Sequence, residues 1–394
     1  MKDQISQFLQ ERIDAGDFPS AVYLVAEKGR IVLQDALGYA VVKPERIEAK
    51  FDTIYDLASL TKVLVTGLLS AKLIENREIN VTDKIASYFN DIATKATNEI
   101  TIKNLLIHTS GLSAWKPFYL ISNFRYEIPR SVFSGEPQNI VNEKVIYSDL
   151  NFLLLTFLLE KLYGQRLDKI AEKEIFEPLK LHKTFFNPPN DLHTQIAASE
   201  RGNEYEKQTC IELGYLKPPD AERDTDMSGG TPNAIINQYS AFRDQQIWGE
   251  VHDGNAYFMG GVAGHAGLFS TAEEVFKIAQ QFLPNYTQLL KPATCEIFRA
   301  DHTKGMNEAR SIAFQLAATP NSTAGSKMSP ESFGHLGFTG TSLWIDPARE
   351  RIFILLVNRT HNHALPFVNL NSVRRRFHDL AIDLLEKNNS NYKT

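Results

Sequence analysis

The sequence predicts an α/β plus all-α protein, in which helices flank an antiparallel sheet built from both ends of the chain. Two segments predict the sheet: residues 21–38 and residues 335–359 each read as two apolar runs joined by a short polar turn, the pattern of a β-hairpin. Between them the chain is mainly helical and rich in loops. We therefore expect a sheet domain from residues 1–78 and 265–394, with a helical domain inserted at residues 79–264.

The composition is that of an ordinary globular protein. The chain has 394 residues, of which 43% are hydrophobic and 23% charged, and its formal net charge of −5 gives no basic surface for nucleic acid. The densest basic run, Arg374–Arg376, is expected on the solvated face of a C-terminal helix. The two cysteines, Cys210 and Cys295, form no disulfide framework, which fits a reducing compartment. The charged N-terminal segment and the lack of a long apolar run predict a soluble, cytoplasmic protein without a membrane partner.

The stretch Ser59-Leu60-Thr61-Lys62 can build a nucleophile and its base within one helical turn. Residues three apart on an α-helix share a face, so the Lys62 amine can reach the Ser59 hydroxyl. A lysine can remove the serine proton only when the amine is neutral. The apolar residues that follow predict a helix buried on nearly all sides, reaching about residue 76. Burial and the helix dipole should both lower the pKa of Lys62.

The Ser-x-x-Lys spacing alone is weak evidence. It recurs at Ser113–Lys116 and Ser390–Lys393, neither of which precedes a long apolar helix. Ser59 could also serve simply as the N-cap of its helix. The assignment therefore needs further elements.

Tyr147 supplies a second element. It precedes an apolar helix that Ser148 or Asp149 can cap and that ends at Gly164. A core aromatic residue beside a helix cap is the structural alternative. A phenol near a lysine and a helix N-terminus can instead relay the serine proton to a leaving group.

A strand over residues 335–346 supplies the third element. Gly337 and Gly340 would weaken it unless something must approach the backbone closely, as an acyl substrate would. The Phe338 N–H could then join the N–H of the nucleophile in an oxyanion hole. His335 could add a polar or cationic group, although a strand histidine is more often structural.

These stretches resemble the three motifs of the serine β-lactamase and penicillin-binding-protein superfamily, most closely those of its class C-like branch, which includes DD-peptidases and family VIII carboxylesterases. Their order and separation fit, and the likeness spans nearly the whole chain. The matching stretches are Ser59-Leu-Thr-Lys62, Tyr147-Ser-Asp149 and His335-Leu-Gly337.

The resemblance implies a β-lactamase/transpeptidase-like fold and a reaction through an acyl-enzyme. Ser59 would be the acylated nucleophile, and Lys62 and Tyr147 would transfer protons. The resemblance leaves open which of these two is the base. The residues implied to line the substrate strand are His335, Gly337 and Phe338.

Two departures bear on the substrate. Asp149 stands where the motif usually has an asparagine, and an ionised carboxylate can only accept hydrogen bonds. Asn151 is the candidate to replace the missing amide contact. Leu336 removes a hydroxyl that would hold a β-lactam or peptide carboxylate. We therefore expect a small ester or amide substrate and an esterase or peptidase-like activity, with a true class C-like β-lactamase as the alternative.

Other classes of function fit less well. The chain has no G-x-S-x-G elbow of an α/β-hydrolase and no H-E-x-x-H metal motif, so neither a metal nor another cofactor is expected. An alternative of another class is a catalytically silent ligand-binding or scaffold protein that keeps the fold. Intact Ser59, Lys62 and Tyr147 argue against it.

Overall fold

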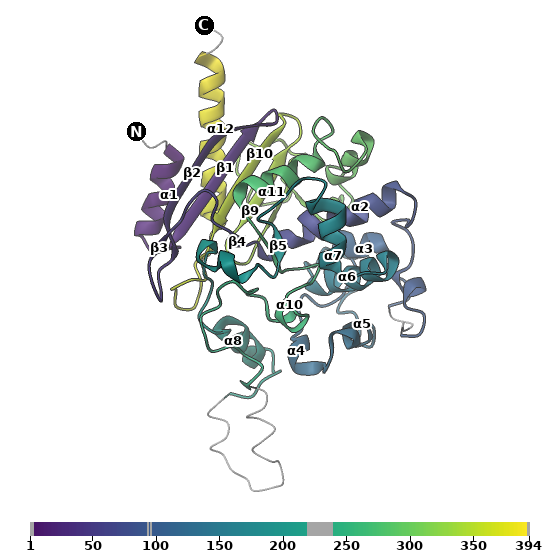
Figure 1. Ribbon diagram of the computed structural model, residues 1–394. Coiled ribbons are helices and arrows are strands. Elements are labelled where there is room, and N and C mark those ends of the chain that lie inside the picture. The colour runs from purple at the N-terminus through teal and green to yellow at the C-terminus, as the bar shows by residue number, and fades with distance from the viewer. Residues whose placement is uncertain (1–3, 93, 95–96, 219–238, 392–394) are drawn as a thin grey trace.

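The computed structural model describes residues 4–92, 94, 97–218 and 239–391 (Figure 1). Its main sheet has seven strands in the order β3-β2-β1-β10-β9-β8-β7, and neighbouring strands are antiparallel throughout. The strands of this sheet are β1 (Ser20–Glu27), β2 (Arg30–Val41), β3 (Ile47–Glu48), β7 (Gln315–Leu316), β8 (Phe333–Leu336), β9 (Ser342–Asp346) and β10 (Arg351–Val357). The predicted fold class is confirmed.

The centre of the sheet joins the two ends of the chain. β1 pairs with β10 in a register that places Val22 opposite Leu356. The predicted hairpins β1–β2 and β9–β10 are both present. The predicted single strand over 335–346 is wrong: β8 and β9 form a hairpin, because Gly337–Thr341 reverses the chain through a Gly337 N–H to Thr341 carbonyl hydrogen bond of 2.8 Å.

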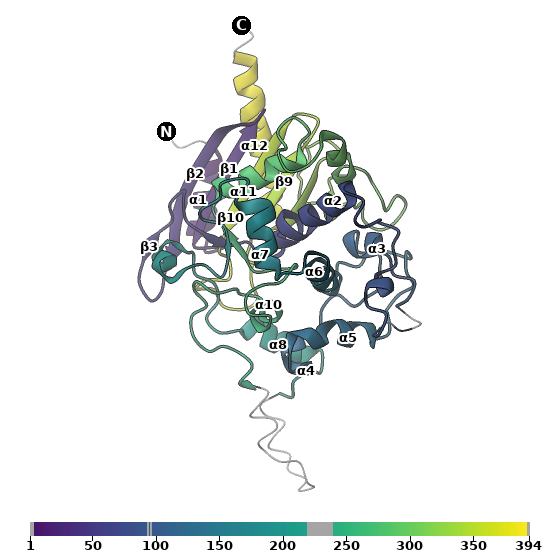
Figure 2. The same ribbon diagram turned by 45° about the vertical axis from the view of Figure 1, so that its right-hand side comes forward.

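Helices cover both faces of the sheet (Figures 1 and 2). Successive β1 side chains point to opposite faces, and both sets are apolar: Tyr23 packs with α1 and α12, whereas Leu24 faces the other core. α1 (Gln4–Asp14) and α12 (Asn371–Asn391) contact each other on the first face, and α11 (Ala272–Ala279) packs on β1 and β10 from the other.

In the sequence, the remaining helices come between the N-terminal strands β1–β3 and the C-terminal strands β7–β10. In space they pack beside the main sheet (Figure 2). A second, three-stranded sheet has the order β4-β6-β5. The helices are α2 (Leu68–Glu75), α3 (Ile102–Leu106), α4 (Phe118–Ile121), α5 (Ile128–Phe133), α6 (Asp149–Tyr163), α7 (Leu167–Ala171), α8 (Glu204–Glu212) and α10 (Gly254–Phe258), and the short strands are β4 (Tyr55–Asp56), β5 (Phe185–Phe186) and β6 (Leu268–Ser270). The division into residues 1–78 with 265–394 and 79–264 stays a prediction.

The helix predicted after residue 59 is more irregular than expected. A 3₁₀ turn, Ala58–Leu60, leads into a π-helical stretch, Lys62–Gly67, and only then into α2. The Thr66 hydroxyl donates to the Gly264 carbonyl at 2.7 Å, so this stretch is tied to another segment as well as to itself. Such π-helical turns are frequent at functional sites.

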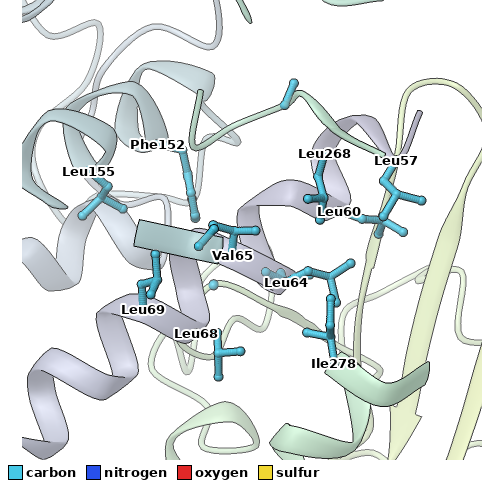
Figure 3. Packing of buried hydrophobic residues seen from close by; sticks show 14 of the residues in the cluster. Leu57, Leu60, Leu64, Val65, Leu68, Leu69, Phe152, Leu155, Leu268 and Ile278 are labelled. Carbon is cyan, nitrogen blue, oxygen red and sulfur yellow. The ribbon is translucent and has the colours of Figure 1, made fainter. Parts of the chain in front are cut away.

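This irregular helix lies at the centre of the core (Figure 3). Its apolar side chains are fully buried, and residues from α6, β6 and α11 pack around it. The side chains labelled in the figure are Leu57, Leu60, Leu64, Val65, Leu68, Leu69, Phe152, Leu155, Leu268 and Ile278. The prediction of burial on nearly all sides is confirmed.

Two further features concern the whole described chain. Cys210 and Cys295 are both buried and unpaired, as predicted. Within the described residues, no helix combines the length and the hydrophobicity that a membrane span requires.

We predict that Leu68→Ala lowers the free energy of unfolding by about 2–5 kcal/mol, because Leu68 is 0% exposed and its removal leaves a cavity in the core. Leu162→Ala on α6 is the matched control: its side chain is 36% exposed, so the change should stay within about 0.5 kcal/mol. Urea unfolding followed by circular dichroism measures both. Equal effects of the two substitutions would contradict this description of the core.

Candidate active site

Ser59 lies in a strained turn between β4 and the buried helix. Ala58 has a φ of 47°, a left-handed conformation that costs energy for a residue with a Cβ. Two hydrogen bonds hold the turn: the Ala58 N–H donates to Asp56 Oδ1 at 2.8 Å, and the Thr61 hydroxyl donates to the Ala58 carbonyl at 2.6 Å. The turn exposes Ser59 to a cavity of about 700 Å³.

This cavity gathers most of the residues singled out in the sequence. Its lining includes parts of the turn before the buried helix, the segment before α6, the β8–β9 turn and α8. The predicted residues in its wall are Ser59, Tyr147, Asp149, His335, Gly337 and Phe338.

Lys62 is fully buried directly behind Ser59, and its ammonium group has three acceptors. Nζ lies 2.9 Å from Ser59 Oγ, 3.0 Å from the His265 carbonyl oxygen and 2.7 Å from Asp149 Oδ1. The first two contacts are hydrogen bonds and the third is an ion pair, so the charge of the ammonium group is balanced by the Asp149 carboxylate.

The pKa of Lys62 is raised, not lowered. Burial lowers it, but the charge of Asp149 and the phenol of Tyr147 together raise it by more. The prediction that Lys62 is a neutral amine at neutral pH is therefore wrong. The sequence argument considered burial and the helix dipole but did not consider a carboxylate at position 149 in direct contact with the amine.

Tyr147 is held from several sides. Its ring centroid lies 4.7 Å from that of His108, 5.0 Å from Lys62 Nζ and 5.6 Å from the guanidinium carbon of Arg310. Burial raises the pKa of the phenol; Asp149 raises it further, whereas Lys62 and contact with Ser59 lower it, and the net shift is upward. Tyr147 is therefore a neutral phenol at neutral pH.

Two histidines beside Tyr147 are neutral. Burial and the charges of Lys62 and Arg310 hold the pKa values of His108 and His335 well below their usual range. His335 Nδ1 lies 2.9 Å from the Leu336 carbonyl and must donate to it, so its Nε2 is an acceptor. His335 thus provides a polar group but not the cationic group that the sequence also allowed.

Two backbone N–H groups lie at the cavity, one from the turn of Ser59 and one from the β8–β9 turn. Among the described residues, the amides of Ser59 and Phe338 donate to no backbone carbonyl. The Gly337 carbonyl points away from the cavity, because it accepts a hydrogen bond from Arg374 Nη2 at 3.1 Å. In a trans peptide the N–H points opposite to the carbonyl, so the Phe338 N–H points towards the cavity.

Arg374 holds this turn from behind. It is 4% exposed and donates to the carbonyls of Gly337 and Thr341, each at 3.1 Å, and its burial lowers its pKa to about 9. The prediction that Arg374 belongs to a solvated helix face is wrong, because this side of α12 packs against the turn. A Cβ at Gly337 would lie 2.6 Å from the Leu57 carbonyl, so this glycine permits the close approach of two protein segments.

Asp149 and Asn151 lie in different environments. Asp149 lines the cavity beside Lys62. Asn151 is 0% exposed, accepts from the Ser110 hydroxyl at 2.6 Å and lies 3.2 Å from His108 Nδ1. The structure does not bring Asn151 to the cavity, so its amide cannot replace the missing one.

Several cavity residues had no signal in the sequence. Arg310, Glu206, His252 and Asp253 all line the cavity but belong to no short motif. They come from loops and a short helix whose positions only the fold determines. Of the other Ser-x-x-Lys stretches, Ser113 lines the cavity, and the end of Ser390–Lys393 lies outside the described residues.

A family model described as Beta-lactamase matches residues 5–373. The chain belongs to the beta-lactamase family. This membership confirms the resemblance in the three motifs and makes the chain a serine hydrolase. Within the described residues of this family member, no group of three or more His, Cys, Asp or Glu side chains is arranged to hold a metal ion.

One relative found by sequence and two solved structures are consistent with this family assignment. A protein of Escherichia coli (strain K12) named "Putative D-alanyl-D-alanine carboxypeptidase" is 29% identical over 390 residues, which cover 91% of this chain and 82% of that protein. The structure of a penicillin-binding protein homolog from Caulobacter crescentus matches with a TM-score of 0.69 and 18% identity over 96% of both chains. That of "EstCE1, a hydrolase with promiscuous acyltransferase activity" matches with a TM-score of 0.68 and 18% identity over 96% of this chain and 97% of that one. Both structures share the fold of this beta-lactamase family member.

We predict that Asp149→Asn brings the pKa of Lys62 below its ordinary value, because burial then acts on the amine without the opposing carboxylate. In the wild type the amine should stay charged as the pH rises through the ordinary lysine range. Carbon NMR of the labelled lysine Cε, assigned with Lys62→Arg, measures both.

Glu172→Gln is the matched control, since this carboxylate pairs with Lys169 on the surface at 2.6 Å. It should leave the titration of Lys62 unchanged. An unaltered titration of Lys62 in Asp149→Asn would show that the carboxylate does not determine its charge.

Proposed function

We propose that Ser59 is the nucleophile, that Tyr147 relays its proton, and that Lys62 acts as a fixed cation. The observation that carries this proposal is the position of the buried Lys62 ammonium, 2.9 Å from Ser59 Oγ and 2.7 Å from Asp149. An amine that already carries its proton cannot take another. It can stabilise the negative charge that develops on Ser59 Oγ during attack.

The acylation step conserves atoms and charge. Ser59 Oγ bonds to the substrate carbonyl carbon while its proton passes to Tyr147 Oη, and the phenolic proton of Tyr147 passes to the leaving nitrogen or oxygen. The bond from the carbonyl carbon to the leaving group then breaks. The N–H groups of Ser59 and Phe338 stabilise the oxyanion. In deacylation, the oxygen of a water molecule bonds to the acyl carbon while the water gives a proton to Tyr147. The bond from that carbon to Ser59 Oγ then breaks, and Tyr147 returns its own proton to Oγ.

We further propose that the substrate is a peptide-like amide or ester with a free carboxylate on the leaving group. Leu336 removes one means of holding such a carboxylate, but Arg310 offers another, because its guanidinium carbon lies 5.6 Å from the centre of the Tyr147 ring. Glu308 Oε2 takes hydrogens from Arg310 Nε and Nη2 only, and a guanidinium has five N–H donors. The name of the Escherichia coli relative, a carboxypeptidase, agrees with this substrate class.

A class C-like β-lactamase activity is the second candidate, since Arg310 would also hold the carboxylate of a β-lactam. Asp149 disfavours it. The side-chain amide of a β-lactam offers a carbonyl oxygen that needs a hydrogen-bond donor, and the Asp149 carboxylate only accepts.

We predict that Ser59→Ala lowers turnover of every substrate by roughly 10⁴- to 10⁶-fold and abolishes labelling by a fluorophosphonate, because the nucleophile is missing. Ser113→Ala, which alters the same motif elsewhere in the cavity wall, should still be labelled. Mass spectrometry of the labelled peptide locates the adduct, and thermal unfolding checks the fold. Wild-type turnover in a folded Ser59→Ala protein would end the proposal.

We predict that Arg310→Gln reduces the preference for a free carboxylate by about 10- to 100-fold, the range expected for a hydrogen bond between charged groups. The measurement is the ratio of kcat/KM for an acyl-D-alanyl-D-alanine and for its C-terminal amide. Arg349→Gln is the control, because this side chain is 43% exposed and pairs with Asp346. A ratio that Arg310→Gln leaves unchanged would exclude Arg310 from carboxylate binding.

A further inference from the structure

Three carboxyl groups line the cavity, and they differ in their partners. Asp149 is paired with Lys62, and Asp253 is paired with His265 Nε2 at 2.9 Å. Within the described part of the chain, Glu206 has no ion-pair partner. It is therefore the one carboxyl in the described cavity wall without an ion pair.

Although Glu206 has no ion pair, neighbouring groups fix the position of its carboxyl group. It lies in the first turn of α8, it is 7% exposed, and its Oε1 accepts from the Gly254 N–H at 2.8 Å. Its Oε2 is buried and, among the described residues, has no hydrogen-bond partner of normal geometry. A Cβ at Gly254 would overlap Oε2 and would also lie 2.7 Å from the Tyr119 ring, so a glycine is needed here for the carboxyl group to fit.

The charge of Glu206 is sensitive to its surroundings. Burial and the neighbouring Asp253 raise the pKa of Glu206 to about 7, whereas His252 and Tyr119 lower it. Within the protein alone the carboxyl is thus close to losing its charge at neutral pH. A cation bound beside it would favour the ionised form.

Aromatic rings lie between Glu206 and the turn that carries the Phe338 N–H. The Tyr205 ring, next to Glu206 in sequence, lies 4.7 Å from the ring of Phe338, and the His252 ring stacks on Phe338 at 5.4 Å. Phe338 carries the N–H assigned above to the oxyanion hole. Ring faces attract cations, so this path suits a positively charged group as well as an apolar chain.

The two ends of the cavity can be assigned to the two parts of the substrate, the leaving group and the acyl portion. Arg310 packs on Tyr147, which delivers the proton to the leaving group, so Arg310 belongs to the leaving-group side. Glu206 lies instead beside Gly254 and next to Tyr205, whose ring packs on Phe338, so we assign it to the side of the acyl portion of the substrate.

We propose that Glu206, supported by Asp253 and the ring of Tyr205, binds a primary ammonium group on the acyl portion of the substrate. The proposal rests on the function proposed above and specifies its substrate class: a short zwitterionic peptide or amide with an ammonium on the acyl side and a carboxylate on the leaving side. Asp149 fits the same class, because it also accepts hydrogen bonds from donor groups and cannot donate.

The test uses p-nitroanilides of glycine, β-alanine, 4-aminobutanoic acid and 6-aminohexanoic acid, each compared with its N-acetyl derivative. The series varies the reach of the ammonium group, and the common leaving group carries no carboxylate, so Arg310 does not affect the comparison. For at least one length, the free amine should exceed its acetylated partner by about 10- to 100-fold in kcat/KM, the range of a charge-assisted hydrogen bond.

Glu206→Gln keeps an acceptor for the Gly254 N–H but removes the charge, and it should lower this ratio by about tenfold or more. Glu206→Asp, which shortens the side chain by one methylene, should give an intermediate ratio, and it provides a second variant should the first not fold. Glu204→Gln is the matched control on the same helix, because Glu204 is 58% exposed and pairs with Lys207. It should leave the ratio unchanged.

Three results separate this inference from the proposed function. If Ser59 is labelled by a fluorophosphonate but the wild-type ratio is one or less at every length, or no free-amine anilide is hydrolysed, the ammonium site is wrong and the proposed function stands. A high wild-type ratio that Glu206→Gln preserves assigns the amine to another group and also overturns the inference. If Ser59 is not labelled at all, the proposed function fails, and the inference fails with it.

Discussion

The contact between Lys62 and Asp149 is the constraint on which the rest of the site depends. A fully buried ammonium loses its hydration, and in the interior only close acceptors offset that cost. Here the acceptors come from three separate parts of the chain: the turn of Ser59, the start of α6 and the carbonyl of His265. One amine therefore sets the relative positions of the nucleophile, the helix that carries Asp149, and the loop before β6.

The same contact determines how protons can move. With Lys62 charged and two histidines neutral, Tyr147 is the group that the proposed mechanism uses to accept one proton while giving up another. A phenol of raised pKa suits a relay better than a stable phenolate would, because it starts and ends the step without charge. Under the function proposed here, the surrounding charges would serve recognition: the Arg310 guanidinium lies beside the phenol, and the Glu206 carboxyl, which has no ion pair, lies elsewhere in the described cavity wall.

Local patterns in the sequence predicted those features that depend on residues close together in the chain. The hairpins, the buried helix and the contact of Ser59 with Lys62 follow from periodicity and from residue spacing, and the three motifs together predicted the family. The charge of Lys62 could not be predicted in this way, since it depends on a carboxylate far away in sequence. The same holds for Arg374, whose buried position depends on how α12 packs, and for Arg310 and Glu206, which reach the cavity from loops without a motif.

Arg374 also links the reaction centre to α12. This helix lies far from Ser59 in the sequence, yet its arginine holds the turn that presents the Phe338 N–H. Without this contact the chain would keep its serine and lysine but would lack the fixed backbone that the proposed oxyanion hole requires.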